Sequence, residues 1–187
     1  MHPRARFPRR FRISSPGDMV QMDTKHVNLI EGRKIYQFTA IDVLSKQRIL
    51  KYYSSLASKN GADFLRHCLT EFPLKIKNIQ TDNGSEFLKE FDKLCQQKKI
   101  PHYFIYPRTP KQNTYVENSH GSDKKEFYLQ GNVCSDVSVM QTRIKQWQDT
   151  WNKIRPHEAL NYLTPDEYLI KWQPGRLPTK DTITLQT

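Results

Sequence analysis

A chain of 187 residues provides sequence for about one domain. Hydrophobic residues make up 36% of it, and 9 Phe, 9 Tyr and 3 Trp supply bulk for a packed core, which excludes global disorder. Lysine and arginine number 30 against 19 aspartate and glutamate residues, and the net charge of +11 favours a polyanionic partner. Nucleic acid is the first expectation, and an anionic membrane surface is the competitor.

Membrane-spanning and disulfide-stabilised proteins are disfavoured by the same sequence. It has no run of about 18 apolar residues, and its N-terminus lacks the apolar stretch of a secretory signal. Cys68, Cys95 and Cys134 lie far apart, with no C-x-x-C pair and no histidines at zinc-finger spacing. We therefore expect a cytoplasmic protein with free thiols and no membrane association.

The first segments in chain order are an arm and a set of strands. Residues 1–17 contain five Arg, three Pro and no acidic residue, which predicts an extended basic arm that lies along phosphates or serves as a linker. β-rich segments with short connections then predict three strands in an antiparallel meander, over residues 18–30, 33–45 and 47–56.

Helices and strands alternate after this meander. Apolar residues at helical spacing predict helices over 58–72 and 87–100, and each is followed by a predicted strand, over 76–82 and 102–107. The order βββαβαβ predicts an α/β fold with a mixed five-stranded sheet flanked by helices, in which the two crossovers create parallel strands.

The rest of the sequence predicts further helices. An apolar stripe indicates one long helix and consists of Met140, Ile144, Trp147, Trp151 and Ile154. Pro165 takes the first position of a last short helix. We expect one core domain over residues 18–172, followed by a tail over residues 173–187.

Three acidic residues occupy positions where two strands and a helix would bring them together. Asp23 lies inside the first predicted strand, where a charge facing the core needs compensation. Asp82 ends the fourth strand, at the edge where such sheets bind ligands, and Glu117 opens the helix after the fifth strand. Asp23 could instead lie on an exposed face, and Asp82 could be a turn residue in Asp-Asn-Gly. Glu117 could instead form a capping box with Thr114.

Together the three acids match the needs of phosphodiester cleavage. Clustered carboxylates repel one another and tend to take up protons. Divalent cations relieve this repulsion, and oxygen-only ligands suit Mg²⁺. Two ions about 4 Å apart can activate an attacking oxygen and stabilise a leaving one, so the trio predicts a site that cuts or joins nucleic acid.

The motifs around these acids, MDTKHV, TDNGSEF and KQNTYVENSHG, resemble the DDE catalytic core of retroviral integrases and bacterial insertion-sequence transposases. The resemblance covers roughly residues 18–170, with 58 and then 34 residues between successive acids. It implies an RNase H-like fold, one Mg²⁺ bound by Asp23 and Asp82, and a second bound by Asp23 and Glu117, with Mn²⁺ as a substitute. The implied reaction frees a 3′-hydroxyl at a transposon end, and that hydroxyl then attacks target DNA. A homodimer or larger assembly on DNA is implied, associated with the bacterial nucleoid.

DNA-binding positions are expected around Glu117. His120 and Lys124 follow it at i+3 and i+7 and would share its helix face, while Lys111 and Asn113 lie in the preceding loop. We expect Lys111, Asn113, His120 and Lys124 to contact DNA, with plain solvent exposure as the alternative.

The capping of this helix follows from the assignment of Glu117. A carboxylate turned toward Asp23 and Asp82 is less free to reach its own helix start, so we expect Asn113 or Thr114 to cap the helix without it. A second T-x-x-E stretch begins at Thr164 and indicates ordinary capping.

The sequence also departs from the family pattern. The 34-residue gap is one residue shorter than is typical of retroviral integrases, which favours the bacterial branch, and Asn118 stands where many bacterial relatives carry a basic residue. Only the 17-residue arm precedes the core, where insertion-sequence transposases carry helix-turn-helix domains and retroviral integrases carry a zinc domain. Two alternatives therefore stay open: an inactive or truncated transposase remnant that binds DNA, and an RNase H-like nuclease acting on RNA–DNA hybrids.

Overall fold

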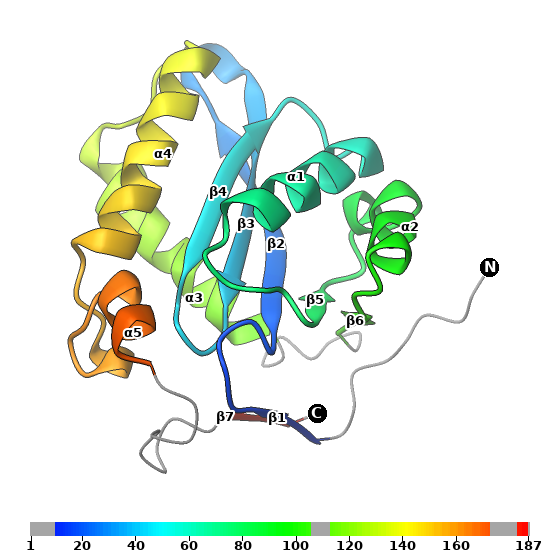
Figure 1. Ribbon diagram of the computed structural model, residues 1–187. Helices are drawn as coiled ribbons and strands as arrows, with labels where there is room; N and C mark the ends of the chain where they lie inside the picture. Colours follow the sequence, from blue (N-terminus) through cyan, green and yellow to red (C-terminus); the bar gives the residue numbers. More distant parts are fainter. Residues whose placement is uncertain (1–9, 106–112, 173–182, 187) are drawn as a thin grey trace.

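A five-stranded mixed sheet forms the centre of the protein in the computed structural model, which describes residues 10–105, 113–172 and 183–186 (Figure 1). The strands are β2 (Val20–Asn28), β3 (Lys34–Asp42), β4 (Arg48–Tyr53), β5 (Ile79–Thr81) and β6 (His102–Phe104). They lie in the order β4-β3-β2-β5-β6. β2, β3 and β4 pair antiparallel, whereas β5 is parallel to both β2 and β6. The predicted α/β fold with a mixed five-stranded sheet is confirmed.

Helices cover both faces of this sheet. The α-helices are α1 (Ser58–Glu71), α2 (Glu90–Gln97), α3 (Thr114–Ser122), α4 (Val137–Lys153) and α5 (Pro165–Lys171). Short 3₁₀ turns are η1 (Ile30–Gly32), η2 (Ser85–Phe87), η5 (Tyr128–Gln130) and η6 (Glu158–Leu160), and η4 (Asp123–Phe127) is π-helical. Figure 1 shows α1 and α2 on one side of the sheet and α3 and α4 on the other. In the described part of the chain, no helix has the length and apolar character that crossing a bilayer requires.

Two apolar clusters hold the helix layers to the sheet. Side chains alternate across a strand, so Ile49 and Leu50 of β4 enter different clusters. Ile49 joins Phe38 and Phe64 on the α1 side. Leu50 joins Ile144 of α4 on the other side. The sheet is therefore buried on both faces, and a charged side chain within its central strands needs a specific partner.

A separate two-stranded sheet joins segments far apart in the sequence. β1 (Arg10–Ile13) pairs antiparallel with β7 (Ile183–Gln186), and neither strand was expected from the sequence. Ile13 is fully buried and belongs to a third apolar cluster with Leu160 and Tyr168. Both strands lie in the stretches expected as arm and tail, and the proposed domain limits stay predictions.

The apolar stripe predicted for the long helix is confirmed except at its end. Met140, Ile144, Trp147 and Trp151 of α4 are buried. Ile154 was expected to continue the stripe, but it is 71% exposed. The reason is that α4 ends at Lys153, so Ile154 leaves the helical path before it can reach the core.

Candidate active site

Asp23 and Asp82 are brought together by the parallel pairing of β2 and β5. The register aligns Met22 with Thr81 at the end of their ladder, and the next residue of each segment is an aspartate. Met22 belongs to the apolar cluster on the α1 side, so Asp23 faces the α3 side of the sheet. The placement that the sequence predicted for these two acids therefore has a simple cause in strand register.

The Asp23 carboxyl lies in a poorly solvated and negatively charged setting. Its side chain is 18% exposed. Burial raises the pKa of Asp23 from 3.8 to about 7, and the charge of Asp82 adds to this rise. A hydrogen bond from the Thr24 amide, at 2.8 Å, favours the ionised carboxylate and partly offsets this rise in pKa. Glu117 and Glu86 raise the pKa of Asp23 further, so the other two predicted acids both act on the Asp23 carboxyl.

Asp82 forms the Asp-Asn-Gly turn that the sequence offered as the alternative to a metal-binding role. Its Oδ1 accepts a hydrogen bond from the Gly84 amide at 2.9 Å, as in an Asx turn. The side chain is half-buried. Turn formation is therefore compatible with a position near Asp23, since the charge of Asp82 acts on the Asp23 carboxyl.

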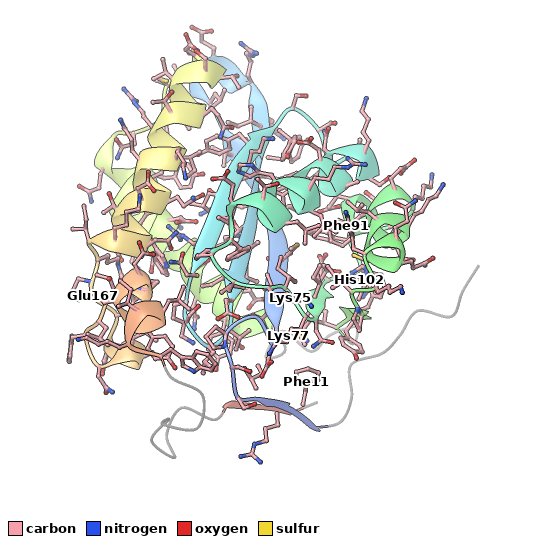
Figure 2. The ribbon with its side chains drawn as sticks, in the orientation of Figure 1. Phe11, Lys75, Lys77, Phe91, His102 and Glu167 are labelled. Atoms are coloured by element: carbon pink, nitrogen blue, oxygen red, sulfur yellow. The ribbon has the colours of Figure 1, made fainter. Side chains whose placement is uncertain are left out.

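Buried side chains support β5 immediately before this turn. Thr81 Oγ1 lies 2.9 Å from His102 Nε2, and His102 Nδ1 lies 3.1 Å from Asp92 Oδ1. His102 also packs edge-on against Phe91, at 5.1 Å between ring centroids (Figure 2). Helix α2 and β6 thus fix the backbone that carries the second aspartate.

Helix α3 carries Glu117 and is capped from β2. Asn113 is the N-cap residue, but its side chain makes no capping hydrogen bond, and Thr114 is already the first helical residue. The expected cap by Asn113 is therefore wrong. Gln21 Oε1 instead accepts hydrogen bonds from the next two helix amides, at 3.1 and 3.3 Å. Because Gln21 lies two residues before Asp23, this cap ties the helix of the third acid to the strand of the first.

Helix α5 shows ordinary capping for comparison. Glu167 donates its amide hydrogen to Thr164 Oγ1 at 3.2 Å, and its carboxylate accepts from the Thr164 amide at 2.9 Å. The T-x-x-E prediction is confirmed there. In α3 the amides are satisfied by Gln21, and Glu117 is exposed.

His120, one of the predicted DNA-contact residues, lies beside Asp23. Its Nδ1 is 3.7 Å from Asp23 Oδ2, and its Nε2 is 3.0 Å from Thr39 Oγ1. The side chain is 14% exposed, and burial lowers the pKa of His120 to about 4. The Lys25 ammonium donates to the His120 carbonyl at 3.1 Å. A neutral imidazole is therefore fixed between β2 and β3 at neutral pH.

The other predicted DNA-contact residues differ in their placement. Lys111 lies outside the described residues. Asn113 is 1% exposed, so it has almost no surface to present to DNA. Lys124 is exposed but lies in the π-helical segment η4, so its i+7 spacing from Glu117 crosses a change of helix type. Their contacts with DNA stay predictions.

A fourth acid, Glu86, lies beside the site and was not singled out from the sequence. It is 4% exposed, and its Oε1 accepts a hydrogen bond from Thr24 Oγ1 at 2.6 Å. Its backbone is held by Gly61 of α1, where an added Cβ would lie 2.2 Å from the Glu86 carbonyl oxygen. In the sequence, only its place in the TDNGSEF motif points to Glu86, and that place does not distinguish a buried acid at the site from an exposed one.

The chemistry of these side chains fits a divalent cation. All three predicted acids offer oxygen ligands, and a cation would relieve the repulsion that adds to the effect of burial on the Asp23 pKa. Among residues 10–105, 113–172 and 183–186, no three acidic, histidine or cysteine side chains lie close enough together to hold a metal ion. Metal binding by Asp23, Asp82 and Glu117 would therefore require these side chains to draw closer together.

The sequence matches a known family. Residues 14–110 match the family described as integrase core domain, and residues 98–165 match a second family of the same description. ORF3 of Spiroplasma virus SpV1-C74 is 26% identical over 180 residues, covering 86% of this chain and 49% of that protein. The 39.2 kDa protein of insertion element IS476 from Xanthomonas euvesicatoria is 27% identical over 166 residues, covering 86% and 46%. The chain spans about half the length of the curated relatives it matches.

Solved structures share the fold. The simian T-cell lymphotropic virus intasome, in complex with PP2A regulatory subunit B56 gamma, matches with a TM-score of 0.73 and 18% identity over 94% of this chain and 60% of that chain. The HTLV-2 integrase catalytic core domain, in a dimeric form with magnesium, matches with a TM-score of 0.65 and 19% identity over 82% and 96%. The RNase H-like fold expected from the motifs is confirmed.

Proposed function

Since the chain belongs to the integrase core domain family, we propose that it is the catalytic core of a DDE transposase or integrase. It cleaves DNA to free a 3′-hydroxyl and joins that hydroxyl to a second DNA. The observation that carries this proposal is the set of three acids Asp23, Asp82 and Glu117, in which the charges of Asp82 and Glu117 both act on the Asp23 carboxyl.

The three acids would hold Mg²⁺, with Mn²⁺ as a substitute. Asp23 and Asp82 would share one ion, and Asp23 and Glu117 a second. When bound, the ions would stabilise charge on the attacking and leaving oxygens of a phosphodiester. The HTLV-2 core domain was solved with magnesium, which supports this choice of ion.

The protein's own residues supply position and charge. The β2–β5 register and the Asp82 turn would hold the two segments that carry Asp23 and Asp82 side by side before any ion binds. Glu117 stands on a separate helix, so it can approach them without distorting the sheet. His120 is neutral and partly exposed, and it can offer a hydrogen bond to a phosphate oxygen near Asp23 without adding charge.

DNA is the proposed partner, both as transposon ends and as target. The net charge of +11 favours association with phosphates. An assembly of two or more copies is proposed because two DNA ends must be joined to one target, and the HTLV-2 core was solved in dimeric and trimeric forms. The place of action is then the compartment that holds the DNA, which for an insertion element is the bacterial cytoplasm.

Nicking of supercoiled plasmid DNA tests the proposal. The chain is incubated with plasmid and MgCl₂ or MnCl₂, and conversion to open circles is measured. Asp82→Asn should lower the rate by about 100-fold or more, since loss of even an outer-shell metal partner costs up to about that much. Asp63→Asn, at an exposed acid on α1, is the matched control and should leave the rate unchanged. Nicking that persists in Asp82→Asn would refute the assigned site, and salt-dependent DNA binding without any metal-dependent nicking would favour the inactive DNA-binding alternative.

A further inference from the structure

A fully buried ion pair joins β4 to the residue that follows α3, the helix that carries Glu117. Arg48 Nη1 of β4 is 2.8 Å from Asp123 Oδ1, and both side chains are 0% exposed. Trp147 Nε1 donates to the same oxygen at 2.7 Å. The Arg48 guanidinium also lies over the Trp151 ring, 3.8 Å from its centroid. Burial would raise the Asp123 pKa, but Arg48 and the hydrogen-bond donors outweigh it and hold that pKa below its usual range.

Hydrogen bonds connect this pair to the acids. Gln37 Nε2 donates to Asp123 Oδ2 at 2.7 Å and to Thr39 Oγ1 at 2.9 Å. Thr39 Oγ1 in turn lies 3.0 Å from His120 Nε2. Thr39 is also the β3 partner of Asp23 in the strand register. A chain of hydrogen bonds therefore runs from Asp123 through Gln37 and Thr39 to His120. The other ring nitrogen of His120 lies 3.7 Å from Asp23.

The Arg48–Asp123 pair also attaches the end of α3 to the sheet. Asp123 is the first residue after α3 and begins the π-helical segment η4. A π-helical turn accommodates an extra residue, which changes the helix phase by about 100° for that residue. Gln21 holds the start of α3 and Asp123 anchors its end, so both ends of the helix that carries Glu117 are fixed to the sheet.

The energetic cost of the Arg48–Asp123 pair indicates that it serves to orient α3 rather than to stabilise the fold. Buried ion pairs are often no better for stability than apolar residues of similar volume. Within the described residues, Arg48 Nε and Nη2 have no hydrogen-bond partner, which adds a desolvation cost. Apolar side chains at positions 48 and 123 would avoid this cost, but they would not fix the rotation of α3.

We propose that Arg48, Asp123 and Gln37 are positioning residues that hold α3 in the orientation in which His120 contacts Asp23 and from which the exposed Glu117 side chain can approach it. The catalytic part of this inference rests on the proposed function. The structural part does not, since it states only which contacts fix α3.

The double variant Arg48→Met/Asp123→Leu replaces the pair with apolar residues and tests both parts. Without metal or DNA, hydrogen exchange followed by mass spectrometry should show α3 amides exchanging about 10-fold faster or more, with β2 and β3 as protected as in the wild type. In plasmid nicking, kcat should fall about 10-fold or more while KM for DNA stays within about twofold, because misplacement of a catalytic group lowers turnover.

Gln148→Leu is the matched control. Gln148 is also buried, and its Oε1 accepts from the Leu50 amide at 2.7 Å, but it has no bond to α3 among the described contacts. This variant should lose stability while its kcat and α3 exchange stay as in the wild type. If it lowers kcat as much as the double variant does, the effect is general destabilisation and the proposal is overturned.

Gln37→Met keeps the inference testable if the double variant does not fold. It removes the link to Thr39 and leaves the ion pair in place, so α3 exchange should still rise and kcat should still fall, by about threefold or more. Unchanged α3 exchange in a folded variant overturns the proposal. If the wild type itself does not nick DNA, the proposed function fails, and the exchange experiment still decides whether the pair fixes α3.

Discussion

Replacing Asp23 with Asn should stabilise the metal-free protein at neutral pH. The pKa of Asp23 is raised from 3.8 to about 7, first by burial and then by the Asp82 charge. A difference of one in pKa corresponds to about 1.4 kcal/mol, so the ionised form costs the folded protein about 4 kcal/mol at high pH. Domains of this kind have only about 5–15 kcal/mol of stability in total. Asn keeps an oxygen for the Thr24 amide and removes the charge.

The sign of the effect depends on pH. The folded protein holds the Asp23 proton more tightly than the unfolded chain does, so this carboxyl lowers stability as pH rises from 3.8 to about 7 and has a constant effect above that. The advantage of Asp23→Asn over the wild type should therefore grow by roughly 2–3 kcal/mol between about pH 5 and about pH 8. Urea unfolding in EDTA, followed by tryptophan fluorescence, measures this difference.

Asp63→Asn provides a control in which loss of the charge should lower stability rather than raise it. The Tyr53 hydroxyl and then Lys51 lower the pKa of Asp63, so its charge stabilises the folded state above its usual pKa and its loss should weaken the protein at about pH 8. Added MgCl₂ should raise the stability of the wild type more than that of Asp23→Asn. If Asp23→Asn is no more stable than the wild type at about pH 8, or if its advantage is the same at both pH values, the electrostatic description of the site is wrong.

Three further predictions concern stability and reactivity. Thr164→Ala should lose the α5 capping box and lower the free energy of unfolding by about 1 kcal/mol in urea titrations; an unchanged midpoint would contradict the role of the cap. Gly61→Ala should lower it by about 1–3 kcal/mol, because the added Cβ would lie 2.2 Å from a backbone oxygen; a stability equal to the wild type would show that the contact relaxes freely. Of the three thiols, the partly exposed Cys134 should react with a disulfide reagent in the native state, whereas Cys68 and Cys95, whose pKa values are raised by burial, should wait for unfolding. Two or more rapid thiols would contradict this.

The element order was predictable because each element carries a local pattern. Phe64, Leu65 and Cys68 recur at helical spacing, and all three are buried in α1. The parallel strands followed from the two crossovers. The end of α4 was harder to place, since Ile154 continues the apolar spacing and only the backbone shows that the helix stops at Lys153.

The acids of the site were predictable from their motifs, whereas the residues that hold them were not. Gln21 caps a helix 94 residues along the chain, and Arg48 pairs with a carboxylate 75 residues away. Gln21 has no sequence pattern that separates it from an exposed strand glutamine. The β1–β7 pairing likewise depends on two short segments from opposite parts of the sequence, and neither has an apolar run long enough to predict it.

Gly61 allows helix α1 to pack directly against the backbone of Glu86, in the segment that follows Asp82. The helix and the Glu86 backbone meet there without any intervening side chain. A side chain between them could change rotamer and absorb a displacement, but two backbones in contact transmit it directly. A displacement of α1 at this point would therefore be passed to the backbone of Glu86, four residues after Asp82.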